Sequence, residues 1–533
     1  MKAGFAGTWA LIRLALRRDR VILPAWIVIF AGLAVGSAAA SIELFPNEQS
    51  RASAAEAVNA APALVALYGQ VYDVTSLGAV AMIKMISLYA LFLAVLAIFT
   101  VTRHTRSEEE TGRLELVGAG VVGRYAALTA ALVVSCGAVV VLGLVTALGL
   151  IGVGLPAAGS IAFGLEWIAV ACVFATIAAV AAQVTENART ANGIAAAAVG
   201  VAFVLRAVGD TSGPGWLTWL SPSGWSTQVR PFAGDRFWVL VIPAVFMIVV
   251  VAVAYVLSAR RDLGAGLIRQ RPGPADAARW LGTPLGLAWR LQRGALLAWT
   301  LGFAVGGLII GNIAASVGDM MEGNDQFRDL LATMGGASGL TDAFFAAVLG
   351  LLSVLASAYG VQAALRLRAE ESGMRAEPVL ASGIARSRWA LSHLLIALVG
   401  TAWLIVVMGA TAGLAHGVQT DDMSGAFGRV VEAALVQIPA IWVLVGIVAA
   451  LFGLVPRLSS LAWVVLVGFL LLGEFGSLFE LNQSVMDVSP YAHVPKLPGG
   501  EMSWPPLLWL VGIAAALTVV GLVGLRRRDV PVT

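Results

Sequence analysis

The chain has 533 residues, of which 59% are hydrophobic and only 12% are charged, and its formal net charge is +3 at pH 7. A typical soluble protein carries about 25% charged residues, so this composition excludes a soluble globular protein and indicates an integral membrane protein. At about 20 apolar residues per spanning helix, the chain has room for about a dozen spans. The small net charge gives no indication of nucleic-acid binding.

The N-terminal segment predicts an amphipathic helix that lies in the inner membrane interface. Its apolar residues recur at helical spacing: Phe5, Trp9, Ile12 and Leu16. Its basic residues share another face: Arg13, Arg17 and Arg20. The alternative is an ordinary basic anchor beside the first span. A cleavable signal peptide is rejected, because a matching segment recurs in the middle of the chain.

Twelve apolar runs long enough to cross a bilayer follow the N-terminal segment. They lie at about residues 22–40, 77–101, 126–154, 160–182, 193–209, 237–258, 294–315, 341–363, 389–415, 430–453, 458–482 and 505–525. With the N-terminus inside, alternating loops place most lysine and arginine residues on the cytoplasmic side, as the positive-inside rule requires. We therefore predict an all-α integral membrane protein with about 12 transmembrane helices and with both termini in the cytoplasm.

Several motifs occur twice, in the same order, about half a chain length apart. Arg17, Arg20, Leu23 and Trp26 recur as Arg290, Arg293, Leu296 and Trp299. Arg106, Glu108, Glu109, Arg113 and Glu115 recur as Arg368, Glu370, Glu371, Arg375 and Glu377. Ser221-Pro222 recurs as Ser489-Pro490, and Arg260-Arg261-Asp262 recurs as Arg527-Arg528-Asp529. The sequence predicts two parallel six-helix repeats, residues 1–258 and 283–533, joined by a cytoplasmic linker at residues 259–282.

Motifs for enzymatic chemistry and for an internal energy source are missing from the sequence. The only lysines are Lys2, Lys84 and Lys496, and none lies in a G-x-x-x-x-G-K-[ST] phosphate loop. H-E-x-x-H and C-x-x-C are also absent. We expect no catalytic residue, no metal and no cofactor in this chain.

Charged residues inside the predicted spans lie toward their outer ends. The candidates are Lys84, Glu166, Arg206, Glu432, Glu474 and Glu480. They either snorkel or pair near the outer headgroups, or they form a charged outer vestibule. Neither interpretation favours a proton relay at the bilayer midplane.

Two loops at equivalent positions of the repeats, residues 102–124 and 364–388, carry the same acidic and basic residues in the same order. We call them the charged loops. Glu109 and Arg113 are four residues apart, as are Glu371 and Arg375, which is the spacing of a helical ion pair. A solvated helix face is one interpretation, and a docking surface for a soluble partner is the other.

Two motifs carry a resemblance to a known family. They are residues 102–113, Thr-Arg-His-Thr-Arg-Ser-Glu-Glu-Glu-Thr-Gly-Arg, and residues 230–236, Arg-Pro-Phe-Ala-Gly-Asp-Arg. Together with the two halves of six spans, they resemble the permeases of type-two ABC exporters. More narrowly, the whole chain looks like the fused, double-length actinobacterial subfamily of polyketide-antibiotic exporters of the tetronasin-resistance type. The second copy departs from the first, with Ser372-Gly373-Met374 in place of Glu110-Thr111-Gly112 and Pro378 in place of Leu116.

The resemblance implies a permease in a bacterial cell membrane that is energised by a separate ATPase subunit. Two copies of that subunit would bind beneath the permease, and ATP and Mg would bind to them. The resemblance assigns coupling to the ATPase to Arg106, Glu108, Glu109, Arg113, Glu115, Arg368, Glu370, Glu371, Arg375 and Glu377. It also implies that the second and fifth spans of each half line the transport path. The candidate path residues are Met82, Met85, Tyr89, Phe92, Phe203, Phe344, Phe345 and Phe469, for which helix packing is the alternative.

We therefore expect an exporter subunit that extrudes hydrophobic or amphipathic compounds, as in antibiotic or multidrug efflux. A proton-coupled carrier with twelve spans is one alternative, because such carriers also consist of two six-span halves. A membrane-embedded transferase for lipid-linked substrates is another. Its site would be the acidic outer loop with Asp319, Glu322, Asp325 and Asp329.

Overall fold

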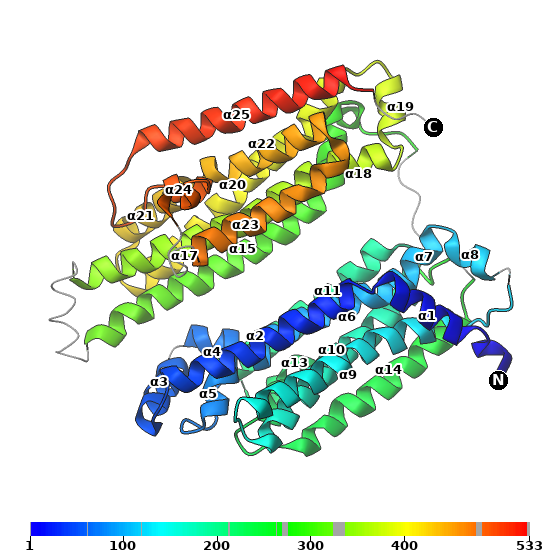
Figure 1. Cartoon of the computed structure of the whole chain (residues 1–533), viewed down its shortest axis with the longest axis vertical. Coiled ribbons are helices and arrows are strands. Elements are labelled where there is room, and N and C mark those ends of the chain that lie inside the picture. Colours follow the sequence, from blue (N-terminus) through cyan, green and yellow to red (C-terminus); the bar gives the residue numbers. More distant parts are fainter. Residues whose placement is uncertain are drawn as a thin grey trace. The chain divides into compact units, whose positions relative to one another are not determined.

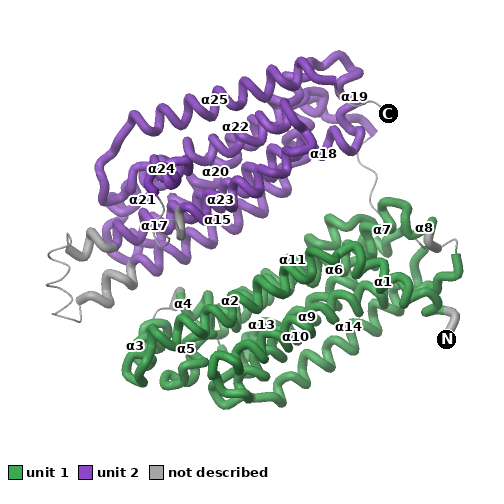
Figure 2. Tube along the Cα trace, in the orientation of Figure 1, with its two compact units in different colours: residues 1–273 green, residues 274–533 purple. Residues whose placement is uncertain are grey.

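The computed structural model consists of helices and loops, with no strand in the residues that it describes. These residues are 2–60, 62–118, 120–211, 214–262, 264–268, 275–322, 336–475 and 482–529, and a few at the range ends are described by their backbone alone. The chain divides into two compact units, residues 1–273 and 274–533 (Figure 2). The division falls inside the predicted linker.

Unit 1 is a bundle in which α1, α7 and α8 lie at one end (Figure 1). Its helices are α1 (Thr8–Arg18), α2 (Ile22–Leu44), α3 (Glu48–Ala60), α4 (Pro62–Tyr68), α5 (Leu77–Lys84), α6 (Ala90–His104), α7 (Arg106–Glu110), α8 (Arg113–Gly118), α9 (Ala126–Gly152), α10 (Ala157–Val184), α11 (Ala188–Thr211), α12 (Trp216–Trp219), α13 (Pro222–Val229) and α14 (Val241–Ala259). A π-helical turn (Met85–Tyr89) joins α5 to α6.

Unit 2 has the same plan, with α18 and α19 at the end of the bundle where the last helix finishes (Figure 1). Its helices are α15 (Pro284–Glu322), α17 (Gly336–Ala364), α18 (Arg366–Ser372), α19 (Ala376–Ala381), α20 (Arg386–Gln419), α21 (Met423–Leu435), α22 (Ile438–Leu454), α23 (Ala462–Phe475), α24 (Gln483–Met486) and α25 (Trp504–Arg527).

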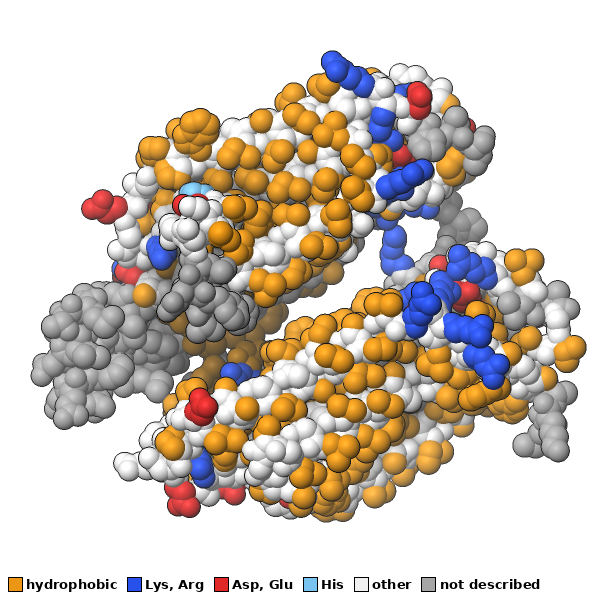
Figure 3. Space-filling model, viewed as in Figure 1, with side chains coloured by type: hydrophobic (Ala, Val, Ile, Leu, Met, Phe, Trp, Pro, Cys, Tyr) orange, Lys and Arg blue, Asp and Glu red, His pale blue; other side chains and the backbone are white. Residues whose placement is uncertain are grey.

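Eleven helices within the described residues are long and apolar enough to cross a membrane. They match the predicted runs except residues 458–482, where the apolar helix Pro456–Leu472 is shorter. Hydrophobic side chains cover the length of each bundle, and basic side chains of unit 1 gather at the end that carries α1 and α7 (Figure 3). The prediction of an all-α, multi-pass membrane protein is confirmed. The count of twelve and the cytoplasmic termini stay predictions.

The centre of unit 1 is α10, which is apolar on every side and is therefore buried by its neighbours. The indole Nε1 of Trp167 donates a hydrogen bond to the carbonyl of Met85 (3.0 Å), the first residue of the π-helical turn. A π-helical turn breaks the regular hydrogen-bond ladder of an α-helix. The Trp167 contact therefore anchors the second span at the point where its helix is irregular.

The segment 230–236 closes the end of unit 1 opposite to α7. Arg230, Phe232 and Asp235 all have positive φ angles (50°, 61° and 40°), which non-glycine residues rarely adopt. The segment is held by its own contacts, because Asp235 Oδ1 accepts a hydrogen bond from the Phe232 amide (2.8 Å) and the Arg230 guanidinium stacks on the Tyr72 ring (3.8 Å). This geometry turns Phe232 into the bundle.

The Phe232 ring lies against Gly78 at the start of the second span and Gly159 at the start of α10. A Cβ atom at Gly78 would lie 2.4 Å from the ring, and one at Gly159 would lie 2.2 Å from it. Real Cβ atoms do not approach other atoms so closely. Both positions therefore require glycine while the ring occupies this place.

We predict that Gly159→Ala destabilises the protein, because the added Cβ and the Phe232 ring cannot both fit. Overpacking of this kind costs about 1 to 3 kcal/mol, and it would appear as a lower melting temperature in detergent. Gly36→Ala on α2 is the control, because an added Cβ there meets nothing within 4 Å. Adding Phe232→Leu to Gly159→Ala should recover part of the lost stability, because leucine is smaller than phenylalanine. Equal stability of the two alanine variants would contradict the tight contact between Phe232 and Gly159.

Candidate functional site: the charged loops of the two halves

The first charged loop folds as two short helices, α7 and α8, rather than as one. Gly112 has φ +69°, a left-handed conformation that ends α7 and redirects the chain before Arg113. At the equivalent position of the second loop, Met374 has φ +57°. Each break falls between the two residues that were expected to form a helical ion pair.

The predicted pairs Glu109–Arg113 and Glu371–Arg375 are wrong for this reason. In both loops the arginine pairs instead with the glutamate one position before the expected partner. Arg113 Nη1 lies 3.7 Å from Glu108 Oε1, and Arg375 Nε lies 3.0 Å from Glu370 Oε2. Glu109 and Glu371 are thereby left for other partners.

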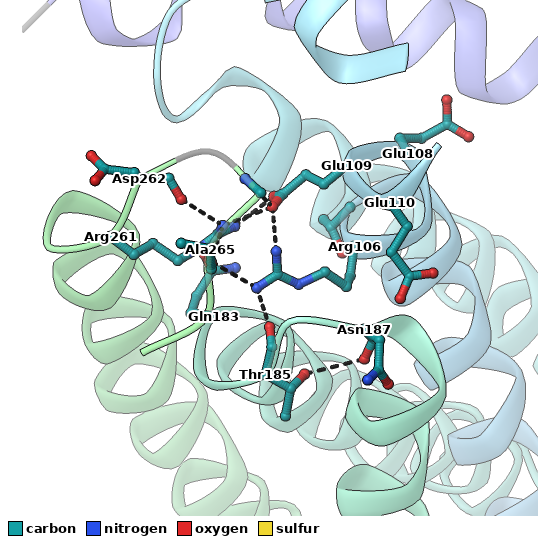
Figure 4. Close-up of polar contacts among 12 residues, drawn as sticks. Arg106, Glu108, Glu109, Glu110, Gln183, Thr185, Asn187, Arg261, Asp262 and Ala265 are labelled. Atoms are coloured by element: carbon teal, nitrogen blue, oxygen red, sulfur yellow. Dashed lines mark hydrogen bonds and ion pairs between the residues drawn. The ribbon is translucent and has the colours of Figure 1, made fainter. Parts of the chain in front are cut away.

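Glu109 forms a two-pronged ion pair with Arg261, which follows the last span of unit 1 (Figure 4). Arg261 Nη2 lies 2.5 Å from Glu109 Oε1, and Arg261 Nη1 lies 2.7 Å from Glu109 Oε2. The Nε of Arg261 donates to Gln183 Oε1 (2.7 Å) at the end of α10. Charge-assisted, bidentate pairs of this kind are stronger and more directional than neutral hydrogen bonds.

Unit 2 repeats this pair with Glu371 and Arg528. Arg528 Nη1 and Nη2 lie 2.8 and 2.5 Å from the two carboxylate oxygens of Glu371. The Arg528 guanidinium also stacks on the Phe452 ring at 4.9 Å. We call Arg261–Glu109 and Arg528–Glu371 the arginine clamps of the two units.

Each clamp also reaches the start of the third span. Arg124 Nη2 donates to the Arg261 carbonyl (2.6 Å), and Arg386 Nη1 donates to the Arg528 carbonyl (2.7 Å). The charged loop, the end of the sixth span and the start of the third span therefore meet at one point in each half. The sequence showed that the charged loop and the Arg-Arg-Asp motif both recur, but not that they contact each other. Their recurrence in both halves was a signal of that contact.

The clamp of unit 1 has a second, completely buried cation. Arg106 is 0% exposed, and its Nη1 lies 2.5 Å from Glu109 Oε2. Its Nη2 donates to the carbonyls of Thr185 and Ala265, which belong to the end of α10 and to the linker (Figure 4). The equivalent Arg368 in unit 2 is 35% exposed and lies 3.8 Å from Glu371. The two loops are therefore unequal.

The first charged loop also contacts α1. Arg18 forms an ion pair with Glu108, and the buried Asp19 pairs with Arg103 (3.0 Å) and His104 (2.5 Å) at the end of α6. The predicted N-terminal helix is present, and Ile12 packs against α9.

Burial argues against Glu109, Glu370 and Glu371 as members of a docking surface. The side chain of Glu109 is 5% exposed, and Glu370 and Glu371 are buried as well. The exposed members of the predicted coupling set are Arg113, Glu115, Arg375 and Glu377. The others hold the loops in place.

The charges predicted at the outer ends of the spans behave differently from one another. Arg206 is buried and donates to the carbonyls of Ala66 (2.6 Å) and Leu67 (3.3 Å), so it caps the end of α4. Glu166 is fully buried and does not snorkel, whereas Lys84 is exposed. The side chain of Glu474 lies outside the described residues.

Several candidate path residues lie in the cores of their own units, where packing explains them. Met82 and Met85 are buried in unit 1, and Phe345 is buried in unit 2. Phe92 is exposed. The partly buried candidates are Tyr89, Phe203, Phe344 and Phe469. Packing accounts for the three buried residues, and the assignment of all eight candidates to a path stays a prediction.

The acidic residues of the outer loop proposed for a transferase lie outside the described side chains. The structure describes only the backbone of Asp319 and Glu322, and Asp325 and Asp329 lie outside the described residues. In the part of the chain that the structure describes, no group of three or more His, Cys, Asp or Glu residues could hold a metal ion.

We predict that Glu109→Gln strongly destabilises unit 1, because it leaves two buried arginines without their carboxylate. Removing one partner of a buried ion pair costs about 3 to 5 kcal/mol. Glu115→Gln on the exposed face of α8 is the matched control, and it should change stability by less than about 0.5 kcal/mol. Thermal unfolding of the purified chain in detergent measures both. If the two variants had the same melting temperature, the clamp would contribute nothing to the stability of the fold.

Comparison with known proteins places these halves in a family. The model of the family described as "Multidrug efflux system permease Rv1217c, C-terminal domain" matches residues 11–259 and 281–526. These segments correspond to the two units. The chain is also 46% identical, over 529 residues, to the multidrug efflux system permease protein Rv1217c of Mycobacterium tuberculosis (strain ATCC 25618 / H37Rv). The match covers 99% of this chain and 96% of the relative. The chain therefore belongs to the multidrug efflux system permease family of Rv1217c, whose members are transporter membrane subunits, and it is a multi-pass protein of the cell membrane.

Proposed function

We propose that this chain is the membrane subunit of an ATP-driven ABC exporter that extrudes hydrophobic or amphipathic compounds. A separate ATPase subunit binds the charged loops and energises transport. The observation that carries the proposal is the pair of arginine clamps, which join a charged loop to the last span in each half. Such a connection is what a loop needs in order to pass the motion of a soluble partner to the membrane helices.

The exposed face of each loop is suited to a protein partner. In unit 1 it carries Arg113, Glu115 and Leu116, and the leucine is 80% exposed. In unit 2 it carries Arg375, Glu377 and Pro378. An apolar contact surrounded by charges of both signs is typical of a protein interface. Two such faces support two copies of the ATPase per permease chain.

The positions of the lysines support an external energy source. Lys84 is the last residue of α5, inside the second span, rather than part of a phosphate-binding loop. Lys496 follows Pro495 and likewise has no Gly-rich loop before it. ATP and Mg therefore bind to the partner subunit in this proposal.

The two docking faces differ in rigidity under this proposal. In unit 1 the linker extends along the end of α10, with the Ile268 amide donating to the Val184 carbonyl (3.0 Å), and Arg106 ties Glu109 to both segments. In unit 2 the equivalent Arg368 is partly exposed and 3.8 Å from its glutamate. The first loop is therefore the stiffer support.

We predict that the purified chain alone hydrolyses no ATP and that the complex with its ATPase subunit does. Vanadate-sensitive turnover by the chain alone would contradict the proposal. Transport that survives ATP depletion but stops with a protonophore would favour the proton-coupled carrier. Turnover of a lipid-linked substrate by the chain alone would favour the transferase.

We also predict that the double variant Glu115→Lys and Glu377→Lys weakens assembly with the ATPase about tenfold, because a rim charge is reversed on each docking face. Co-purification and substrate-stimulated ATP hydrolysis measure this loss. Glu501→Lys is the control, because Glu501 is exposed in the loop before α25, far along the chain from both charged loops. Full assembly and stimulation in the double variant would show that the ATPase docks elsewhere.

A further inference from the structure

An apolar groove of about 940 Å³ lies between α15 and α20 in unit 2. Leucine, isoleucine and valine side chains make up most of its walls, with Trp289 and Trp403. Arg293 is the one charged residue that lines it. Both tryptophans are about half exposed, so the groove is open along its length.

The internal repeat shows that the equivalent place in unit 1 is filled. Ile12, Leu23, Val134 and Ala138 of unit 1 correspond to Leu285, Leu296, Ile396 and Gly400 of unit 2. In unit 1 these four residues belong to one packed cluster that joins α1, α2 and α9. In unit 2 all four line the open groove.

The difference arises where the amphipathic segment meets the first span of each half. In unit 1, Asp19 ends α1, and its pairs with Arg103 and His104 hold the break, so α1 is a separate helix that packs on α9. In unit 2, Gln292 occupies the equivalent position inside the continuous helix α15 and contacts His393 Nδ1 (3.1 Å). Because α15 has no break there, no separate helix covers the groove.

Charge favours an anion at this groove. The stretch of α15 from Pro284 to Ala314 and the whole of α20 carry four arginines and no Asp or Glu: Arg290, Arg293, Arg386 and Arg388. Arg293 lies near the start of the predicted seventh span, at the level of the lipid headgroups. Thr300 lines the groove about 10 Å further into the bilayer at 1.5 Å per residue. A cation at the interface with an apolar channel below it matches the two parts of an anionic lipid.

We propose that the groove between α15 and α20 binds an anionic phospholipid from the leaflet on the side of the charged loops. Its acyl chain lies between Leu297, Val399 and Trp403, and its phosphate contacts Arg293. The lipid takes the place in unit 2 that α1 takes in unit 1. None of the residues that line this groove is a candidate path residue or lies on a docking face.

The test is native mass spectrometry of the full chain in mild detergent, titrated with phosphatidylglycerol or with phosphatidylcholine of the same acyl chains. The wild-type chain should retain one phosphatidylglycerol more tightly than phosphatidylcholine. Arg293→Gln should weaken phosphatidylglycerol binding about fivefold, the effect of one interfacial basic residue. Arg457→Gln is the control, because Arg457 is exposed and does not line the groove.

A second pair of variants tests the groove itself. Gly294→Leu places a side chain in the groove, where an added Cβ meets nothing within 4 Å, and it should remove the tight lipid. Gly302→Leu on the same helix is the control, because its added Cβ also meets nothing and the residue does not line the groove. Val399→Trp is a second filling variant, and size-exclusion chromatography shows which variants are folded.

Three results would overturn the proposal. Equal binding of the two lipids would show that the site does not recognise the headgroup. An unchanged affinity in Arg293→Gln would show that Arg293 does not bind the phosphate. Tight lipid that persists in folded Gly294→Leu and Val399→Trp would show that lipid binds elsewhere, as it would if another part of the chain or a second copy covered the groove.

Discussion

A carboxylate almost closed off from water organises the charged end of each half. Glu109 and Glu371 each need a cation, because an isolated charge in such a place would cost far more than the fold could compensate. In both halves that cation is the second arginine of the Arg-Arg-Asp motif after the sixth span. It is Arg261 for Glu109 and Arg528 for Glu371. A buried ion pair is weak evidence for stability, but its bidentate geometry fixes one arrangement of the segments that it joins.

The consequence for function is mechanical. Under the proposed function, a shift of the loop between the second and third spans moves the end of the sixth span, because the clamp joins both and Arg124 or Arg386 adds the third span. In unit 1, Arg106 extends this connection to α10 and to the linker, and Arg18 extends it to α1. In the described residues of the second half, Arg368 is partly exposed, and Gln292 lies inside the continuous helix α15 where Asp19 ends α1 in the first half. The second loop is therefore less constrained, and the amphipathic segment of this half leaves a groove open.

The helical class could be predicted from the sequence, because long apolar runs are visible without three-dimensional information. The repeated motifs likewise led to the prediction of two six-span halves with a charged loop in each, which stays a prediction. It failed on the pairing within the loops. The i, i+4 spacing of Glu109 and Arg113 assumes one continuous helix, and Gly112 breaks that helix. Gly112 was visible in the sequence as a possible break, whereas in the second loop the glycine, Gly373, lies one position before the residue with positive φ, Met374. The long-range partners Arg261 and Arg528 could not be assigned from spacing, since they lie beyond four further spans. The apolar path candidates stay predictions, since periodicity does not tell a residue that faces its own bundle, such as Met82, from one that faces outward.

If the clamp transmits the state of the charged loop to the last span, a charge swap in unit 2 should reveal it. Substrate-stimulated ATP hydrolysis should be measured in the reconstituted complex for Glu371→Arg, for Arg528→Glu and for both together. Each single variant should lose stimulation, and the double variant, in which the two charges are exchanged, should regain a substantial part of it. Full stimulation in the single variants, or a double variant no better than either, would contradict transmission through the clamp.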